Sequence, residues 1–343
     1  MNIRLFVNCI EATIRKALSK RKILSHNPFF VYFESTLRCN MRCIFCNVWR
    51  GNPYPDEAST EQFKRRLTEC RNLGGRIVSF TGGEPLLRDD IGELTNFAKN
   101  DLRMYTGLVT NGLLLDKKIE EIADNLDLLA VSFDSVDKDV FNFTRGTKGY
   151  GRVRRNIEMC ASMGLPVNVF STITSDTVSG LEELIEFARN LDIDIHFSPV
   201  DEVPREMVEI SQAKDLGTLN WDQVVKNLSA AKKEYRKIHF DKGYFDFHAS
   251  GGFQNSPLLC NTAFVLLSLK PDGSVAFPCP FYTLKTIKVD EKLKLCWYSE
   301  ELERLREKSG RWDFCSKCKI SCVYGMAMID HPMRALKVWL DYT

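Results

Sequence analysis

Short β-rich runs alternate with amphipathic helical patterns from Phe29 to Val200, and this alternation strongly restricts the possible folds. The predicted strands are Phe29–Ser35, Arg76–Phe80, Met104–Val109, Leu128–Phe133, Pro166–Thr172 and Asp194–Ser198. The predicted helices between them lie near Thr60–Leu73, Ile91–Asn100, Lys117–Asn125, Gly151–Met163 and Leu181–Asn190. Strands that alternate with helices of this length form βαβ units in a parallel sheet with right-handed crossovers. Six such strands predict an α/β fold, an open (β/α)6 partial barrel.

Four polar loops directly follow the first four predicted strands. They are the cysteine-rich run after Ser35, then Thr81-Gly82-Gly83-Glu84-Pro85, Thr110-Asn111-Gly112 and Asp134-Ser135. In barrels of parallel strands, the loops after the carboxyl ends of the strands carry the chemistry. The sequence therefore predicts one polar rim built from these four loops.

The first rim loop contains three cysteines, Cys39, Cys43 and Cys46, within eight positions. Four-iron clusters are normally held by four cysteines. Three cysteines leave one iron open, and an open metal position can bind a reactant. A zinc site would usually show paired C-x2-C units or nearby histidines, and a disulfide framework needs an oxidising compartment. We therefore expect an iron–sulfur cluster, with zinc as the alternative.

Composition restricts the remaining possibilities. The chain has 343 residues, twelve cysteines and a net charge of +2, so no global field favours nucleic acid as a partner. The sequence has no apolar run long enough to span a bilayer and no secretory signal at its start. We therefore expect a cytoplasmic protein with reduced thiols, whose many cysteines bind metal.

The spacing C-x3-C-x2-C, with Phe45 before the third cysteine, resembles the signature of the radical S-adenosylmethionine (SAM) enzymes. Gly82-Gly83-Glu84-Pro85 is similar to the family's GGEP motif. The resemblance implies a partial barrel and a [4Fe–4S] cluster on Cys39, Cys43 and Cys46, whose open iron takes the amino and carboxylate groups of SAM. It also implies reductive cleavage of SAM to a 5'-deoxyadenosyl radical, hydrogen abstraction from an unactivated carbon, and an electron donor such as flavodoxin or ferredoxin.

The same resemblance implies a set of residues that bind SAM. They are Phe45 beside the adenine, Gly82, Gly83 and Glu84 at the amino group, Asn111, Ser132 and Asp134 at the ribose and methionine groups, and Arg145 at the carboxylate. From the residues alone, other roles stay open. Gly-Gly pairs form turns, asparagine and aspartate form Asx turns, Phe45 suits a core, and an arginine can lie on the surface. No residue that abstracts or donates a proton is identified.

A second group of cysteines follows in the C-terminal part: Cys260, Cys279, Cys315, Cys318 and Cys322. The first two bracket β-rich runs around Pro271-Asp272-Gly273, a hairpin signal. A hairpin followed by a helix near Glu300–Lys308 and a cysteine knot resembles the SPASM or twitch extension of radical SAM enzymes. That resemblance implies an auxiliary [4Fe–4S] cluster on the first four, with Cys322 as a substitute. Zinc is again the alternative.

The expected organisation has four parts: residues 1–28, a basic amphipathic helix; 29–205, the partial barrel; 206–256, a linker with a helix; and 257–343, a small hairpin-plus-helix domain. Basic residues beside an apolar face within residues 3–22 suit either a helix packed across the open side of the barrel or contact with a membrane surface, and the second reading favours an apolar, even lipid, substrate. A peptide, a sugar or a tetrapyrrole is the alternative substrate. A zinc-binding scaffold is the non-enzymatic alternative.

Overall fold

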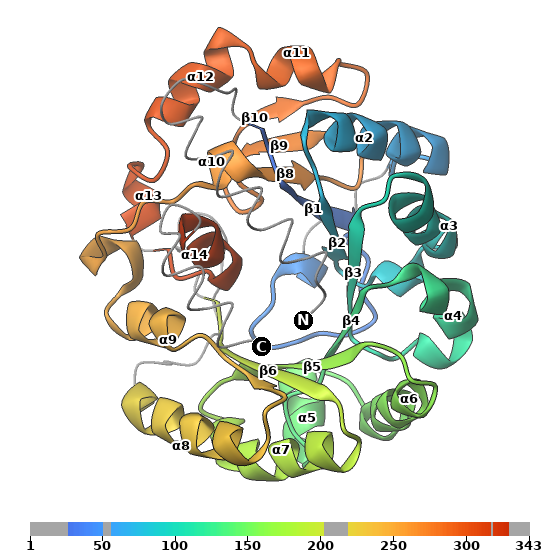
Figure 1. The fold of residues 1–343 in the computed structure, drawn as a ribbon, viewed down its shortest axis with the longest axis vertical. Helices are drawn as coiled ribbons and strands as arrows, with labels where there is room; N and C mark the ends of the chain where they lie inside the picture. Colours follow the sequence, from blue (N-terminus) through green and yellow to red (C-terminus); the bar gives the residue numbers. More distant parts are fainter. Residues whose placement is uncertain (1–26, 51–55, 202–218, 317, 329–343) are drawn as a thin grey trace.

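A single curved sheet of ten strands forms the centre of the computed structural model (Figure 1). The structure describes residues 27–50, 56–201, 219–316 and 318–328. The strand order is β10-β9-β8-β1-β2-β3-β4-β5-β6-β7. The strands are β1 Phe30–Thr36, β2 Ile77–Gly82, β3 Tyr105–Thr110, β4 Leu128–Ser132, β5 Val167–Ile173, β6 Asp194–Pro199, β7 Ile238–His239, β8 Leu266–Leu269, β9 Val275–Pro278 and β10 Thr283–Ile287. The expected α/β partial barrel is confirmed, since β1 to β6 pair in parallel and in sequence order.

Helices cover the outer face of this sheet (Figure 1). They are α2 Thr60–Leu73, α3 Ile91–Asn96, α4 Leu115–Ile122, α5 Lys138–Arg145, α6 Tyr150–Ser162, α7 Leu181–Asn190 and α8 Trp221–Glu234. The capping box is present at the start of α2, where Ser59 and Gln62 bond each other's backbone N–H groups. Helix α5 was not predicted, because its eight residues are too few to show a clear apolar period.

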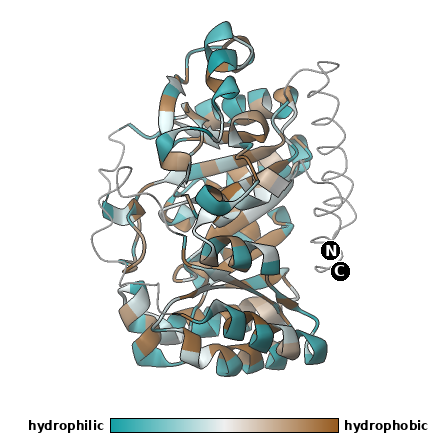
Figure 2. Cartoon of the chain, turned by 90° about the vertical axis from the view of Figure 1, so that its left-hand side faces the viewer, coloured by the Kyte–Doolittle hydropathy of each residue, from teal (hydrophilic) through white to brown (hydrophobic). Residues whose placement is uncertain are grey.

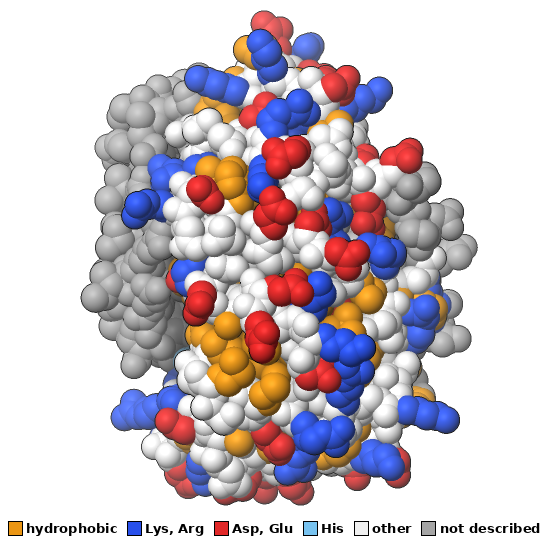
Figure 3. All heavy atoms as spheres, turned by 90° about the vertical axis from the view of Figure 1, so that its right-hand side faces the viewer, with side chains coloured by type: hydrophobic (Ala, Val, Ile, Leu, Met, Phe, Trp, Pro, Cys, Tyr) orange, Lys and Arg blue, Asp and Glu red, His pale blue; other side chains and the backbone are white. Residues whose placement is uncertain are grey.

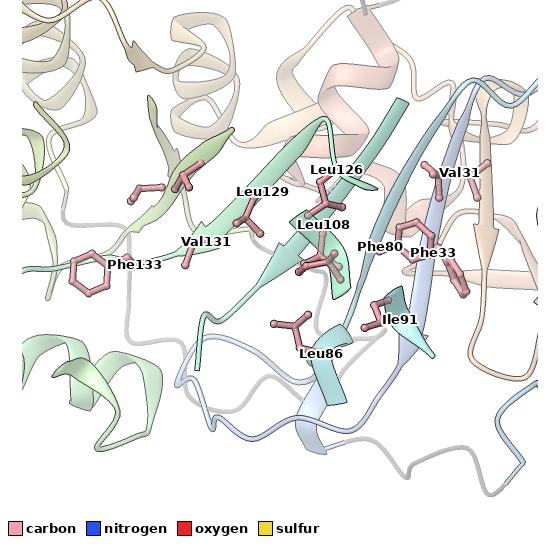
Figure 4. Packing of buried hydrophobic residues seen from close by; sticks show 14 of the residues in the cluster. Val31, Phe33, Phe80, Leu86, Ile91, Leu108, Leu126, Leu129, Val131 and Phe133 are labelled. Carbon is pink, nitrogen blue, oxygen red and sulfur yellow. The ribbon is translucent and has the colours of Figure 1, made fainter. Parts of the chain in front are cut away.

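The hydrophobic core lies between the sheet and these helices. Figure 4 shows residues of alternate strand positions, such as Val31, Phe33 and Phe80, packed together on one face of the sheet. Hydrophilic and hydrophobic residues are interspersed along the helices, as the hydropathy colours of Figure 2 show. Because side chains alternate along a strand, the residues between these core positions face the inside of the curved sheet.

The sheet extends beyond the six predicted strands on both edges. At one edge, β8 pairs in parallel with β1 and antiparallel with β9, so the C-terminal hairpin continues the barrel sheet. At the other edge, β7 adds to β6 from within the predicted linker. Pairing partners this distant in sequence leave no local signal, which is why the hairpin was expected to stand in a separate small domain.

The remaining helices lie beside the hairpin and the open side of the sheet (Figure 1). They are α9 Lys242–Ala249, α10 Thr262–Val265, α11 Leu293–Trp297, α12 Glu300–Glu307, α13 Asp313–Ser316 and α14 Ser321–Met328. A second, smaller core joins α9 to α14 through Tyr244, Phe247 and Tyr324. Within the described part of the chain, no helix has both the length and the hydropathy needed to cross a membrane. The predicted amphipathic helix at residues 3–22 lies outside the described residues.

Candidate active site

The first cysteine loop leaves the carboxyl end of β1 and is held by the backbone that ends α5. The N–H of Arg42 donates to the carbonyl of Arg145 (3.2 Å), and the N–H of Ile44 donates to that of Thr144 (3.0 Å). Gly146, at φ +57°, ends α5, and a Cβ there would lie 2.1 Å from the carbonyl oxygen of Arg42. The Thr144-Arg145-Gly146 segment therefore fixes the path of the cysteine loop.

The thiols of Cys39, Cys43 and Cys46 lie close enough to influence one another's ionisation. Burial raises the pKa of all three, and burial together with the neighbouring thiolate charges raises that of Cys46 to about 11. Such thiols stay protonated at neutral pH unless a metal holds them as thiolates. The three cysteines therefore fit a metal cluster that requires three thiolate ligands.

Two N–H donors approach these sulfurs. The Asn111 amide Nδ2 lies 3.9 Å from Cys39 Sγ, and the Arg145 guanidinium Nη1 lies 4.0 Å from Cys43 Sγ. Donors around ligating sulfurs tune a cluster's reduction potential. Among the described residues, no three His, Cys, Asp or Glu side chains converge tightly enough to hold a single metal ion.

The glycine pair after β2 lies against the backbone that leads into the cysteine loop. A Cβ at Gly82 would lie 2.4 Å from the Thr36 carbonyl oxygen, and one at Gly83 would lie 2.2 Å from that of Arg38. The N–H groups of Gly83 and Glu84 donate to these same two carbonyls, at 2.7 and 2.8 Å. The pair therefore permits close contact between two rim loops, a requirement that the sequence alone did not reveal.

The Glu84 side chain is fully buried and joins the second rim loop to the third. One carboxylate oxygen accepts from the Thr110 hydroxyl (2.7 Å) and the Leu86 N–H (3.1 Å), and the other accepts from the Asn111 N–H (2.7 Å). Both oxygens are thus engaged within the protein. In this structure the Glu84 carboxylate positions the Asn111 loop, while its predicted contact with SAM stays a prediction.

Replacing Glu84 by Gln should change how stability depends on pH. Burial raises the Glu84 pKa from 4.5 to about 7. As the pH rises from about 4.5 to 7, the Glu84 carboxyl loses its proton in the unfolded chain before it does so in the folded protein. The free energy of unfolding therefore falls by up to about 3 kcal/mol over this range. Urea unfolding of cluster-free protein at pH 4 and 7.5 should show this loss in the wild type and not in Glu84→Gln. Identical pH dependence in both would contradict the raised pKa.

Asn111 and Ser132 lie at the carboxyl ends of β3 and β4, as predicted. The Asn111 Nδ2 donates to Asn40 Oδ1 (2.6 Å) in the cysteine loop, and its Oδ1 accepts from the Leu113 N–H (3.0 Å) in an Asx-type turn. Ser132 is half-buried and faces the inside of the sheet opposite Phe170 of β5. Asn111 therefore contacts the cysteine loop directly, through a partner, Asn40, that the sequence analysis did not select.

Asp134 and Arg145 form a buried ion pair. The Arg145 Nε and Nη2 donate to the two carboxylate oxygens at 2.5 and 2.7 Å, and the Thr172 N–H donates to the same carboxylate at 2.8 Å. The nearby carboxylate raises the pKa of Arg145 despite its burial. The Arg145 guanidinium also lies 5.2 Å from the centre of the half-buried Phe45 ring. The edge of the Arg145 guanidinium that carries Nε and Nη2 thus binds Asp134, and the remaining nitrogen, Nη1, approaches the Cys43 sulfur.

A second cysteine site lies between the hairpin and α13. An apolar pocket with about 420 Å³ of space free of protein atoms, part of it open to solvent, is lined by Cys260, Cys279, Cys315 and Cys318, together with Phe253, Trp312 and Phe314. Burial, together with the charges of neighbouring thiolates, raises the pKa of Cys279 to about 11 and that of Cys315 to about 12. This site brings together the four residues that the sequence analysis preferred.

Cys322 lies near the same group but does not line the pocket. Burial raises its pKa, and so does the negative charge of Asp201, which follows β6. The Asp201 carboxylate accepts from the Tyr244 hydroxyl (3.0 Å) and the Ser321 N–H (2.8 Å). Cys322 therefore lies where the barrel meets α14, a position that only the tertiary structure reveals.

The inner face of the sheet carries a further set of side chains. The partly exposed members are mainly polar: Tyr32, Ser79, Thr81, Ser132, Asn168, Thr172, His196 and Ser198. Phe170 of β5 stacks with His196 of β6, with ring centres 5.1 Å apart. Lys270 of the hairpin forms an ion pair with Glu34 of β1 and donates to the Pro280 carbonyl (3.0 Å). The inner face therefore presents hydrogen-bonding groups and two aromatic contacts, since the Tyr32 ring also lies 6.4 Å from that of Phe281.

Residues 33–191 match the model of the Radical SAM superfamily. These residues, a little under half of the chain, are therefore similar to the radical SAM domain, and enzymes of that superfamily use a [4Fe–4S] cluster and SAM. The probable GTP 3',8-cyclase of Methanopyrus kandleri is 39% identical over 175 residues, which cover 50% of this chain and 56% of that protein. This chain thus matches little more than half the length of that relative.

Two solved structures share the fold over most of the chain. SuiB of Streptococcus suis bound to S-adenosylmethionine has a TM-score of 0.67 and 19% identity, covering 89% of this chain and 74% of its own. The protein anSMEcpe with bound AdoMet has a TM-score of 0.61 and 17% identity, covering 90% and 98%. At these identities, the likeness concerns the fold alone.

Proposed function

We propose that this chain cleaves SAM at a cluster held by Cys39, Cys43 and Cys46 and abstracts hydrogen from a polar substrate in the barrel interior. The observation that carries the proposal is the convergence of one buried and two half-buried thiols with three further rim loops. When bound, the cluster and SAM supply the deoxyadenosyl radical. The chain holds these cofactors, orients the substrate and excludes water.

The roles of the rim residues follow from their contacts. Asn111 and Arg145 bring N–H donors to the sulfurs of Cys39 and Cys43, and Glu84 fixes the Asn111 loop. Gly82, Gly83 and Ser132 line the same rim with backbone and hydroxyl groups that suit the amino acid and ribose parts of SAM. Phe45, beside Arg145, provides a flat apolar face for the adenine.

The polar lining favours a hydrogen-bonding substrate, such as a sugar or a peptide, over a lipid. A lipid would offer no hydrogen bond to Asn168 Oδ1, a buried acceptor with no partner among the described residues, and an unpaired buried polar group costs about 1–3 kcal/mol. The hypothesis of an apolar substrate on a membrane surface rests on residues 3–22, outside the described chain. A GTP-like substrate, as the name of the Methanopyrus relative suggests, would need cations for its phosphates, and Lys270 already pairs with Glu34.

A deuterium-transfer experiment tests this proposal. Cells grown in D2O are extracted into an aqueous and a chloroform fraction, and each is incubated with the reconstituted enzyme, SAM and dithionite. We expect deuterium in the 5'-methyl group of deoxyadenosine only with the aqueous fraction. Deuterium only with the chloroform fraction would return the lipid hypothesis to first place. Failure to form deoxyadenosine with any fraction would contradict radical SAM chemistry itself.

The second cysteine site is proposed to hold an auxiliary [4Fe–4S] cluster on Cys260, Cys279, Cys315 and Cys318. Because these four line one pocket and Cys322 does not, Cys279→Ala should remove about four of eight irons, whereas Cys322→Ala should leave the iron content unchanged. Iron analysis and absorption spectra of anaerobically purified protein check both variants. Loss of iron in Cys322→Ala with retention in Cys315→Ala would require the other grouping of ligands.

A further inference from the structure

Two guanidinium groups lie over one indole ring beside the first cysteine loop. The Cζ atoms of Arg42 and Arg50 are 5.2 and 4.7 Å from the centre of the Trp49 ring. The Trp49 Nε1 donates to the carbonyl oxygen of Cys43 (3.1 Å). This contact places the stacked side chains next to the backbone of a proposed cluster ligand.

The stack carries positive charge with no countercharge among the residues that the structure describes. Among the residues that the structure describes, Arg42 donates only to the backbone carbonyls of Cys39 and Met41, and neither Arg42 nor Arg50 pairs with a carboxylate. Residues 37–50 contain three arginines and no acidic residue, and the five residues that follow Arg50 carry no charge. Like charges held together repel, so an anionic group outside this segment would stabilise the arrangement.

A third exposed cation lies close by. Lys148 follows Gly146 by two residues, and Gly146 packs against the Arg42 carbonyl. The outer helical face differs, because Figure 3 shows cations and carboxylates interspersed there. On that face Lys118 pairs with Glu121, and Arg152 pairs with Asp116. An uncompensated cluster of exposed cations is therefore a local feature of the cysteine loop.

We propose that Arg42, Trp49, Arg50 and Lys148 form the docking surface for an acidic one-electron carrier protein; this rests on the proposed function. The carrier loses one electron and the adjacent cluster accepts it, with no proton or group transferred. Arginine and tryptophan are the residues that most often dominate the binding energy of protein interfaces. Complementary charge accelerates the encounter of two proteins and orients them, and salt weakens this attraction.

The test uses the cluster-loaded enzyme and an acidic flavodoxin as the carrier. The variant Arg50→Glu/Lys148→Glu changes two exposed side chains that take no part in holding the cysteines. A matched control, Lys226→Glu/Lys233→Glu, makes the same charge change on α8, beyond β6. Calorimetry gives the Kd for flavodoxin at low salt and at about 0.5 M NaCl. At the higher salt concentration, charge–charge attraction between the proteins is screened beyond a few ångströms.

We expect the docking-surface variant to bind flavodoxin at least about tenfold more weakly at low salt, and the control to bind like the wild type. The difference should disappear at high salt, and deoxyadenosine formation driven by dithionite should be unchanged. Unaltered binding, or equal weakening in the control, would overturn the proposal, as would an equal loss with dithionite. A wild type inactive with dithionite would refute the proposed function instead, whatever the binding result.

Discussion

Replacing Cys39, Cys43 and Cys46 together by Ala should leave about four of eight irons and abolish the formation of deoxyadenosine. The three thiols share one loop and influence one another's pKa, so they are expected to bind a single cluster. Removing all three prevents partial cluster binding, which a single substitution could permit. Iron analysis and chromatography of the products after incubation with SAM and dithionite provide the two measurements.

The matched controls are cysteines that the structure places elsewhere. Cys160 is fully buried in the core, and Cys296 lies beside Glu291 in the region of α11. Cys160→Ala and Cys296→Ala should retain all the iron and the activity with SAM. A triple variant that still cleaves SAM would refute the assignment of the catalytic cluster.

Replacing Asp134 by Ala should lower the free energy of unfolding by about 3–5 kcal/mol. The substitution leaves the Arg145 guanidinium charged and buried, and loss of one partner of a buried ion pair carries a cost of this size. The Thr172 N–H loses its acceptor as well. Urea unfolding of the cluster-free protein at neutral pH measures the effect without a contribution from metal binding.

The exposed ion pair between Asp116 and Arg152 provides the control. Their side chains are 37% and 36% exposed, so Asp116→Ala should cost less than about 1 kcal/mol. A loss for Asp134→Ala no greater than that for Asp116→Ala would show that the buried pair does not stabilise the fold.

The local pattern of the sequence predicted the barrel itself. The expected helices Thr60–Leu73 and Leu181–Asn190 have the observed bounds, because each shows a clear apolar period and a defined start. The six strands agree to within two residues at their ends. The cysteine spacing and the GGEP segment similarly predicted the radical SAM domain, since both motifs are contiguous in sequence.

The contacts between loops became visible only in the tertiary structure. Glu84 bonds to Asn111, and Arg145 approaches Cys43, across separations that no periodic pattern records. The sequence by itself determined which residues follow each strand, because side-chain alternation and helix periodicity are local. The curvature and pairing of the sheet decided which of these residues meet, because contact between distant segments depends on where each strand is placed.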